Sequence, residues 1–90
     1  MFTMQFFISE ENIAQYIENL REKKLAGSTI EKYERDIRAF AYFLNGAEIT
    51  KQAALNWQNV LLETRAVTSI NAAITAINGY FDYFKLGIKI

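Results

Sequence analysis

The 90-residue chain contains no cysteine and no histidine. These absences exclude disulfides, thiolate metal sites, cysteine nucleophiles and any serine–histidine or cysteine–histidine catalytic pair. Proline is also absent and glycine occurs only four times, which favours long helices interrupted at a few points. The sequence therefore predicts no cofactor and no metal site, and it argues against a stand-alone enzyme.

An excess of charge of one sign is missing too, because ten basic residues are balanced by ten acidic ones. A neutral chain has no overall attraction to nucleic acid or to an anionic membrane, so any basic site must be local. No apolar run approaches the ~18 residues that span a bilayer. The amino-terminal segment lacks a basic leader and a small-residue cleavage site. We therefore expect a cytoplasmic protein with no membrane partner.

Hydrophobic residues make up 51% of the chain and aromatic residues 14%, which is enough for one small core. Four segments show apolar residues at helical spacing. They run from about 9 to 24, 28 to 44, 50 to 63 and 68 to 85. The predicted fold is all-α, a compact four-helix bundle over residues 9–86, with an amino-terminal arm at 1–8 and the start of a linker at 87–90.

Helix ends are predicted from local chemistry. The expected N-terminal caps are hydroxyl residues: Ser9, Ser28 in a capping box with Glu31, Thr50, and Thr68 or Ser69. Asn45 and Gly46 should end the second helix, because both tolerate positive φ. Gly79 lies inside the fourth helix, where glycine is unfavourable, and this predicts close packing at that position.

The apolar spacing also predicts which side chains are buried. The expected core comprises Tyr33, Ile37, Phe40, Trp57, Ile74, Ile77 and Phe81, and the arm residues Phe2, Met4, Phe6 and Phe7 should pack on it. All the acidic residues are expected on solvated outer helix faces: Glu10, Glu11, Glu18, Glu22, Glu31, Glu34, Asp36, Glu48, Glu63 and Asp82.

The second helix carries a mixed-charge outer face. At 100° per residue, Ser28, Lys32 and Arg35 fall opposite the apolar stripe, and Thr29 lies at the helix start. Hydroxyls and N–H groups at a helix start suit phosphate, and the two cations could reach a phosphate or a base edge. The alternative is a solvated face with ion pairs Glu31–Arg35, Glu34–Arg38 and Lys32–Asp36, which charge pattern alone favours.

The fourth helix carries an uncharged polar stripe. Asn71, Thr75, Asn78 and Asp82 are spaced by four, three and four residues, and Ser69 lies at the start. Asn can read adenine in a major groove, and hydroxyls can bind phosphates or base edges. Without cations the stripe lacks the counterion-release term that dominates DNA affinity, so plain solvation is the alternative.

The segment "STIEKYERDIRAFAYFL" resembles the second helix of the N-terminal core-binding, SAM-like domain of phage integrases, which are tyrosine recombinases. The matching residues are Ser28, Thr29, Ile30, Tyr33, Arg35, Asp36, Ile37, Phe40 and Leu44. The segments "ISEENIAQYIENLREKKL", "EITKQAALNWQNVL" and "VTSINAAITAINGYFDYF" resemble the first, third and fourth helices. The resemblance covers about residues 8–86.

This resemblance implies that the chain clamps double-stranded DNA at a crossover site through its second and fourth helices. Strand exchange would be performed by a separate C-terminal catalytic domain, in an assembly with other protomers of a recombinase tetramer. The implied DNA contacts are Lys24, Ser28, Thr29, Lys32 and Arg35 on the second-helix side, and Ser69, Asn71, Thr75 and Asn78 on the fourth helix. No catalytic residue is expected in this chain.

One feature departs from the family pattern. Family members commonly carry basic residues along the fourth helix, where this chain has Ala73, Asn78 and Gly79. We therefore expect weak, salt-sensitive DNA binding. The rival hypothesis is a helical protein-interaction module without DNA binding, favoured by neutrality and by Leu55 and Leu62 off the main apolar stripe. Convergence of Lys24, Lys32 and Arg35 with the start of the fourth helix would favour DNA.

Overall fold

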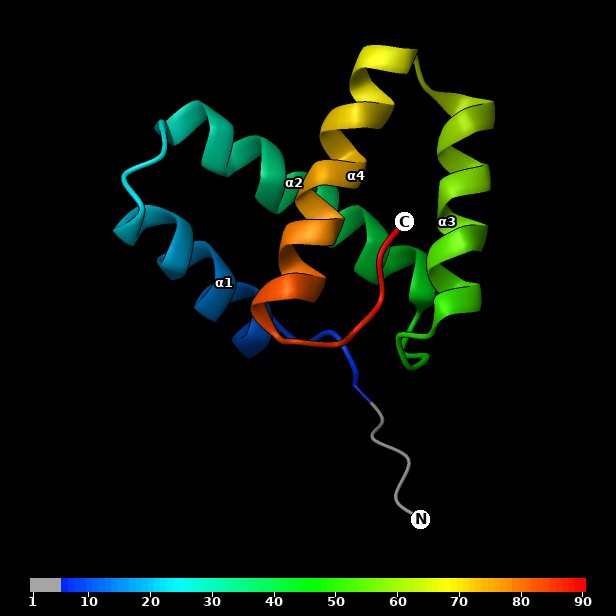
Figure 1. Ribbon diagram of the computed structural model, residues 1–90, viewed down its shortest axis with the longest axis horizontal. Helices are drawn as coiled ribbons and strands as arrows, with labels where there is room; N and C mark the ends of the chain where they lie inside the picture. The colour runs from blue at the N-terminus through cyan, green and yellow to red at the C-terminus, as the bar shows by residue number, and fades with distance from the viewer. Residues whose placement is uncertain (1–5) are drawn as a thin grey trace.

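Four helices make up the fold of residues 6–90, which are the residues that the computed structural model describes. They are α1 (Glu10–Glu22), α2 (Gly27–Leu44), α3 (Lys51–Thr64) and α4 (Val67–Tyr83). In Figure 1, α1 and α2 form a hairpin, α4 crosses in front of α2, and α3 stands beside α4. The prediction of an all-α four-helix domain is confirmed.

Two of the predicted helix caps are confirmed and two are wrong. The hydroxyls of Ser9 and Thr50 accept the N–H groups of Asn12 and Ala53, as expected for N-terminal caps. The other helices begin earlier than predicted, with Ala26 before α2 and Ala66 before α4 in the extended conformation of an N-cap. Ser28, Thr68 and Ser69 therefore lie inside the first helical turn, where their backbone is already helical. The capping box with Glu31 does not form.

The predicted stop after the second helix is confirmed. Asn45 has φ 49° and Gly46 has φ 87°, so the chain leaves α2 through two consecutive left-handed residues. Lys24, in the turn between α1 and α2, is also left-handed, with φ 59°. The first of these turns sends the chain toward α3, and the second reverses it from α1 into α2.

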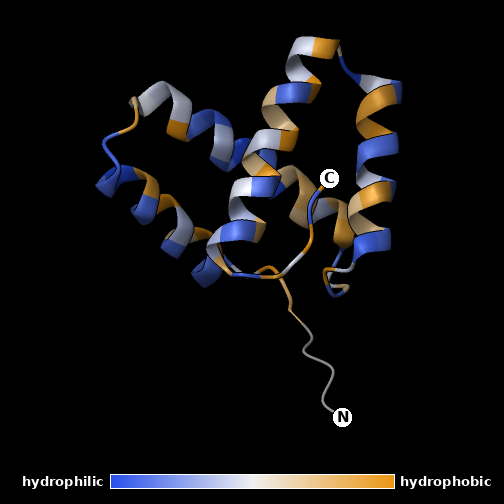
Figure 2. Ribbon diagram, in the orientation of Figure 1, coloured by the Kyte–Doolittle hydropathy of each residue, from blue (hydrophilic) through white to orange (hydrophobic). Residues whose placement is uncertain are grey.

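The core lies where α2 and α4 cross. Ile37, Phe40, Ile77 and Phe81 are completely buried, and Trp57 is buried from the α3 side. Tyr33 and Ile74, which were also predicted to be core, are half-buried and pack against this cluster. Figure 2 shows hydrophobic segments recurring along all four helices between hydrophilic ones, which is the pattern that packs one stripe of each helix inward.

One carboxylate lies inside the protein rather than on an outer helix face. Asp36 is only 3% exposed, and its Oδ1 accepts a hydrogen bond from Nη1 of Arg65 at 2.9 Å. The prediction that Asp36 is solvated is wrong because the connection between α3 and α4 crosses this edge of α2 and brings Arg65 to it. A buried carboxylate needs such a partner to offset its desolvation.

The amino-terminal arm packs on the core in part. The carbonyl of Phe6 accepts the N–H of Ile49 at 2.7 Å, and its ring lies against the rings of Tyr80 and Phe84. Phe7 points the other way and is 45% exposed, so its predicted packing is wrong, as expected for neighbours in an extended segment. Phe2 and Met4 lie outside the described residues.

The close packing predicted at Gly79 is confirmed. A side-chain carbon at this position would collide with the hydroxyl of Tyr16 in α1, and Tyr16 is itself buried. Glycine therefore leaves room for the Tyr16 hydroxyl of α1 against α4. Within residues 6–90, each helix is too short or too polar to cross a bilayer.

The ion pair between Arg65 and Asp36 yields a prediction for stability. Arg65→Met should leave the buried carboxylate unpaired and lower the free energy of unfolding by about 3 kcal/mol, measured by urea denaturation. Arg21→Met is the matched control, because Arg21 pairs with Glu18 where both side chains are 62% exposed, and it should cost less than about 1 kcal/mol. Equal losses in the two variants would contradict a special role for the buried pair.

The contact between Gly79 and Tyr16 yields a second prediction. Gly79→Ala should destabilise the fold by roughly 1–3 kcal/mol through overpacking, although Ala is normally the better helix residue. Adding Tyr16→Phe removes the colliding oxygen and should restore part of the loss, as read from thermal unfolding. Gly27→Ala is the control, since a carbon there meets nothing within 4 Å, and it should be neutral or stabilising.

Candidate nucleic-acid interface

The outer face of α2, formed by Ser28, Lys32 and Arg35, lies fully on the surface. All three side chains are exposed, whereas Thr29 is half-buried at the helix start. Lys24 is exposed in the turn that precedes α2. The core residues Ile37 and Phe40 lie on the opposite side of the helix, so the apolar stripe anchors α2 and leaves this face free.

The two cations of this face have no ionic partner within residues 6–90. The predicted pair Glu31–Arg35 does not form there, and Lys32–Asp36 does not form because Asp36 is turned inward to Arg65. The third predicted pair, Glu34–Arg38, does form, with 3.0 Å between its atoms. Lys32 and Arg35 therefore keep their charge available, although Glu31 and Glu34 lie nearby in sequence.

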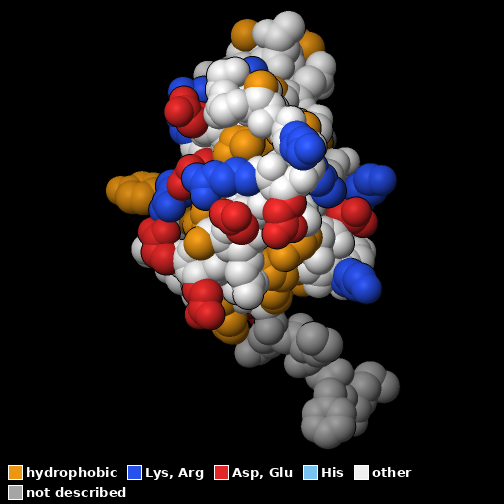
Figure 3. Space-filling model, turned by 90° about the vertical axis from the view of Figure 1, so that its left-hand side faces the viewer, with side chains coloured by type: hydrophobic (Ala, Val, Ile, Leu, Met, Phe, Trp, Pro, Cys, Tyr) orange, Lys and Arg blue, Asp and Glu red, His pale blue; other side chains and the backbone are white. Residues whose placement is uncertain are grey.

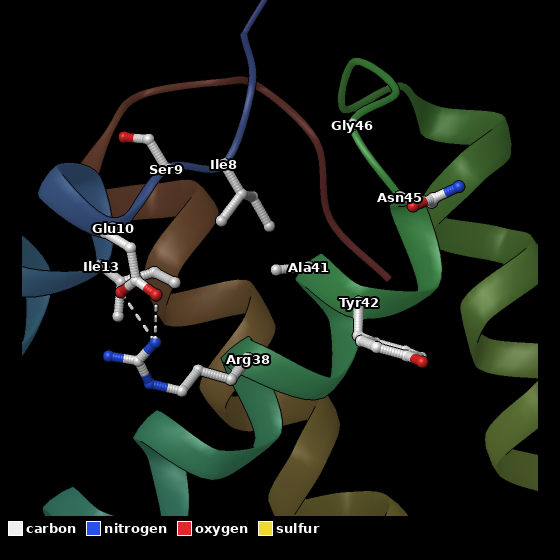
Figure 4. Close-up of a pocket in the computed structure, with 9 residues that line it drawn as sticks. All are labelled: Ile8, Ser9, Glu10, Ile13, Arg38, Ala41, Tyr42, Asn45 and Gly46. Carbon is white, nitrogen blue, oxygen red and sulfur yellow. Dashed lines mark hydrogen bonds and ion pairs between the residues drawn. The ribbon is translucent and has the colours of Figure 1, made fainter.

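On the other side of α2, toward α1, the charged side chains form ion pairs with one another. Nη1 of Arg38 donates to both carboxylate oxygens of Glu10, at 2.7 and 2.8 Å, as Figure 4 shows. These hydrogen bonds, followed by those with Glu34, raise the pKa of Arg38. The pair borders an open hollow of about 390 Å³ lined by Ile8, Ser9, Glu10, Ile13, Arg38, Ala41, Tyr42, Asn45 and Gly46. In this hollow the acid and the base therefore bind each other.

The polar stripe of α4 has its groups partly engaged. Asn71 and Thr75 are exposed, but the hydroxyl of Thr75 donates to the carbonyl of Asn71 at 2.8 Å. Asn78 is half-buried, and its side-chain amide binds the backbone of Ile90. Of the two asparagines, Asn71 is the one whose side-chain oxygen and NH2 group form no hydrogen bond with the described residues.

Ser69 does not belong to this stripe. It precedes Ala73, Ala76 and Tyr80 by four, seven and eleven residues, so the four share one face of α4. Those three residues are completely buried, and Ser69 is accordingly half-buried at the open end of this face. Ser69 therefore lies on a buried face of α4, and Asn71 lies on the exposed stripe.

The predicted contact residues consequently form two separate surfaces. α2 and α4 pack on each other through their buried faces, and this is the largest helix–helix contact in the described chain. Their outer faces must then point in different directions. Lys32 and Arg35 lie on the exposed face of α2 and Asn71 and Thr75 on the exposed stripe of α4, whereas Asn78 binds Ile90 and Ser69 is half-buried.

The starts of α2 and α4 share one further property. Within residues 6–90 neither helix has a side-chain cap, in contrast to α1 and α3. The N–H groups of the first turn are left for solvent or for an anion, and hydroxyl residues lie beside them. Thus both helices that sequence reasoning assigned to DNA begin with open hydrogen-bond donors.

Arg65 is the charged residue near this region that sequence reasoning missed. It ends α3 and stands two residues before α4, and its side chain reaches α2 at Asp36. The available signals were an isolated cation in a very short connection and an acidic residue at the edge of the apolar stripe. Figure 3 shows the opposite end of the molecule, around the α1–α2 hairpin, where basic and acidic side chains are intermixed rather than segregated.

Comparison with known protein families agrees with this architecture. The family model described as phage integrase, N-terminal SAM-like domain, matches residues 13–86, which run from the first turn of α1 to just beyond α4. Neither a curated protein nor a solved structure matches the chain. The match covers most of the 90 residues and all four helices, and the chain therefore belongs to the phage integrase N-terminal SAM-like domain family.

Proposed function

We propose that this chain is the core-binding domain of a site-specific tyrosine recombinase and that it clamps double-stranded DNA at a crossover site. The proposal rests on one observation: in this member of the family, the outer face of α2 presents exposed cations. Lys32 and Arg35 are exposed there without ionic partners in residues 6–90, beside a helix start without a side-chain cap. Cations and free N–H groups are the donors that phosphate oxygens accept.

The proposed contact surface is centred on the first half of α2. Lys24, Ser28, Thr29, Lys32 and Arg35 would bind phosphates or base edges, and Ser69 would contribute from the first turn of α4. Asn71 and Thr75 face elsewhere, so they would meet DNA only if it bent around α4. Such contacts position a duplex rather than read many bases.

Three of the five tyrosines, Tyr16, Tyr33 and Tyr80, are at least partly buried, which makes them poor candidates for the nucleophile of strand cleavage. Burial raises the pKa of Tyr16 to about 12, with smaller contributions from Tyr33 and Asp82, and burial also raises the pKa of Tyr80. Tyr33 is half-buried against the core. In this family the catalytic activity lies in a separate C-terminal domain, and we propose that this domain, assembled with other protomers on DNA, performs the strand exchange.

Affinity for DNA should be modest. The chain is neutral, and Glu31 and Glu34 flank the cations of the contact face, so the counterion-release contribution comes from only a few side chains. Binding by this domain should therefore be weak, fall as salt is added, and depend on the catalytic domain for full strength.

A second candidate function is a helical protein-interaction module. Leu62 is 60% exposed and Val67 is 72% exposed, on either side of the short α3–α4 connection. Apolar side chains at such exposure can meet a protein partner. This function would require no basic face. A titration with DNA therefore distinguishes the two functions, because only the first predicts binding.

Charge removal on the α2 face tests the proposed function. In Lys32→Ala/Arg35→Ala, the slope of log affinity against log salt should fall by about 2, and binding at low salt should weaken about tenfold or more. The measurement is fluorescence anisotropy with a labelled duplex at several salt concentrations, and circular dichroism verifies the helical fold.

The control removes two charges elsewhere. In Arg21→Ala/Lys89→Ala, both side chains are exposed and lie outside the proposed face, so the net charge changes equally and binding should change little. Equal losses in the two double variants would refute a defined contact face. Absence of binding by the parent chain at low salt would favour the interaction module.

A further inference from the structure

The chain does not leave the domain when α4 ends. Lys85 with φ 54° and Gly87 with φ 73° reverse its direction, and in Figure 1 the following residues run back along α4 toward α3. Leu86, Ile88 and Ile90 are half-buried, while Gly87 and Lys89 between them are exposed. This alternation is the pattern of an extended strand lying on an apolar surface.

The N–H of Leu86 donates to the carbonyl of Phe81 at 3.0 Å, and three further hydrogen bonds join the backbone of this segment to side chains of α3 and α4. Nδ2 of Asn78 donates to the carbonyl of Ile90 at 3.2 Å, and the N–H of Ile90 donates to Oδ1 of Asn78 at 2.9 Å. Nζ of Lys51, at the start of α3, donates to the carbonyl of Lys89 at 3.0 Å. A side-chain amide carries a donor and an acceptor side by side, so Asn78 can satisfy both backbone groups of one residue.

The segment does not fill the surface on which it lies, because two hollows remain beside it. A hollow of about 400 Å³ separates part of the segment from the second half of α4, and Asn78, Asp82, Lys85 and Lys89 are among its lining residues. A smaller hollow of about 260 Å³ lies on the arm side, lined in part by Phe6, Phe84 and Ile88. The segment is therefore less closely packed than the fully buried helical core, and it should open without unfolding the helices.

We propose that α3 and α4 form a docking site for an extended backbone segment, occupied by residues 86–90 of the chain itself. Asn78 is the residue that recognises the segment, and Lys51 is its second anchor. The docked segment acts as a latch that fixes Ile90 beside the middle of α4, and with it the direction in which any following segment departs. This assigns Asn78 to the latch rather than to DNA, and it does not depend on the proposed function.

Hydrogen exchange of the Ile90 amide, measured by NMR on the full chain without DNA, tests the latch directly. The parent chain should protect this amide, and Asn78→Ala should accelerate its exchange about tenfold, because the acceptor is lost. Asn78→Asp keeps an acceptor oxygen and loses the donor, so it should give a smaller acceleration. The amides of Ile37 and Phe40 report the helical core and should be unchanged.

The matched control is Asn71→Ala. Asn71 lies two helical turns earlier on the same stripe of α4 and is exposed, so the substitution is chemically identical but should leave Ile90 protection unchanged. Should Asn78→Ala fail to fold, Lys51→Met tests the other anchor and should also accelerate exchange at Ile90. An unprotected Ile90 amide in the parent chain would overturn the latch, as would equal acceleration by Asn71→Ala and Asn78→Ala.

Discussion

The packing of α2 against α4 is the constraint on which the rest of this small domain depends. Their completely buried residues meet at the crossing, where the rings of Phe40 and Phe81 lie 5.9 Å apart in an edge arrangement. Every other element is placed relative to this pair: α1 approaches through Gly79, and α3 adds Trp57 against Phe40. Because each helix buries one stripe in this contact, the direction of each outer face follows from it.

This packing also decides how charge is distributed on the surface. In a neutral chain, a local basic site requires that nearby acidic side chains be paired with other cations. Three acidic residues around α2 are paired in this way. Glu10 and Glu34 bind Arg38 on the α1 side, and Asp36 is drawn inward by Arg65. Lys32 and Arg35 are thereby left on the outer face without a partner in residues 6–90. Ion pairing on one side of the helix thus leaves two cations without an ionic partner on the other.

The buried pair of Asp36 and Arg65 joins two parts of the domain that are 29 residues apart in sequence. It ties the middle of α2 to the connection that launches α4, so the starts of the two helices are held in a fixed relation. The latch of residues 86–90 acts in a similar way at the other end of the fold, tying the chain after α4 to α3 and α4. Both the ion pair and the latch are made of polar contacts between elements whose cores are apolar. Hydrogen bonds are directional and apolar packing is not, so these contacts help to fix how the elements are oriented.

The family pattern, the number of helices and most of the core could be predicted because they depend on local periodicity and composition. Ile37, Phe40, Trp57, Ile77 and Phe81 recur at helical spacing, and the caps at Ser9 and Thr50 and the stop at Asn45 and Gly46 are local chemistry.

Other features could not be predicted because they require partners that are distant in sequence. The burial of Asp36 depends on Arg65, the engagement of Asn78 depends on Ile90, and the early start of α2 leaves Ser28 inside the helix. Sequence by itself determined which residues form helices and which stripe of each helix is apolar. Only the tertiary structure decided which polar groups remain free, because helix crossing and chain return place their partners.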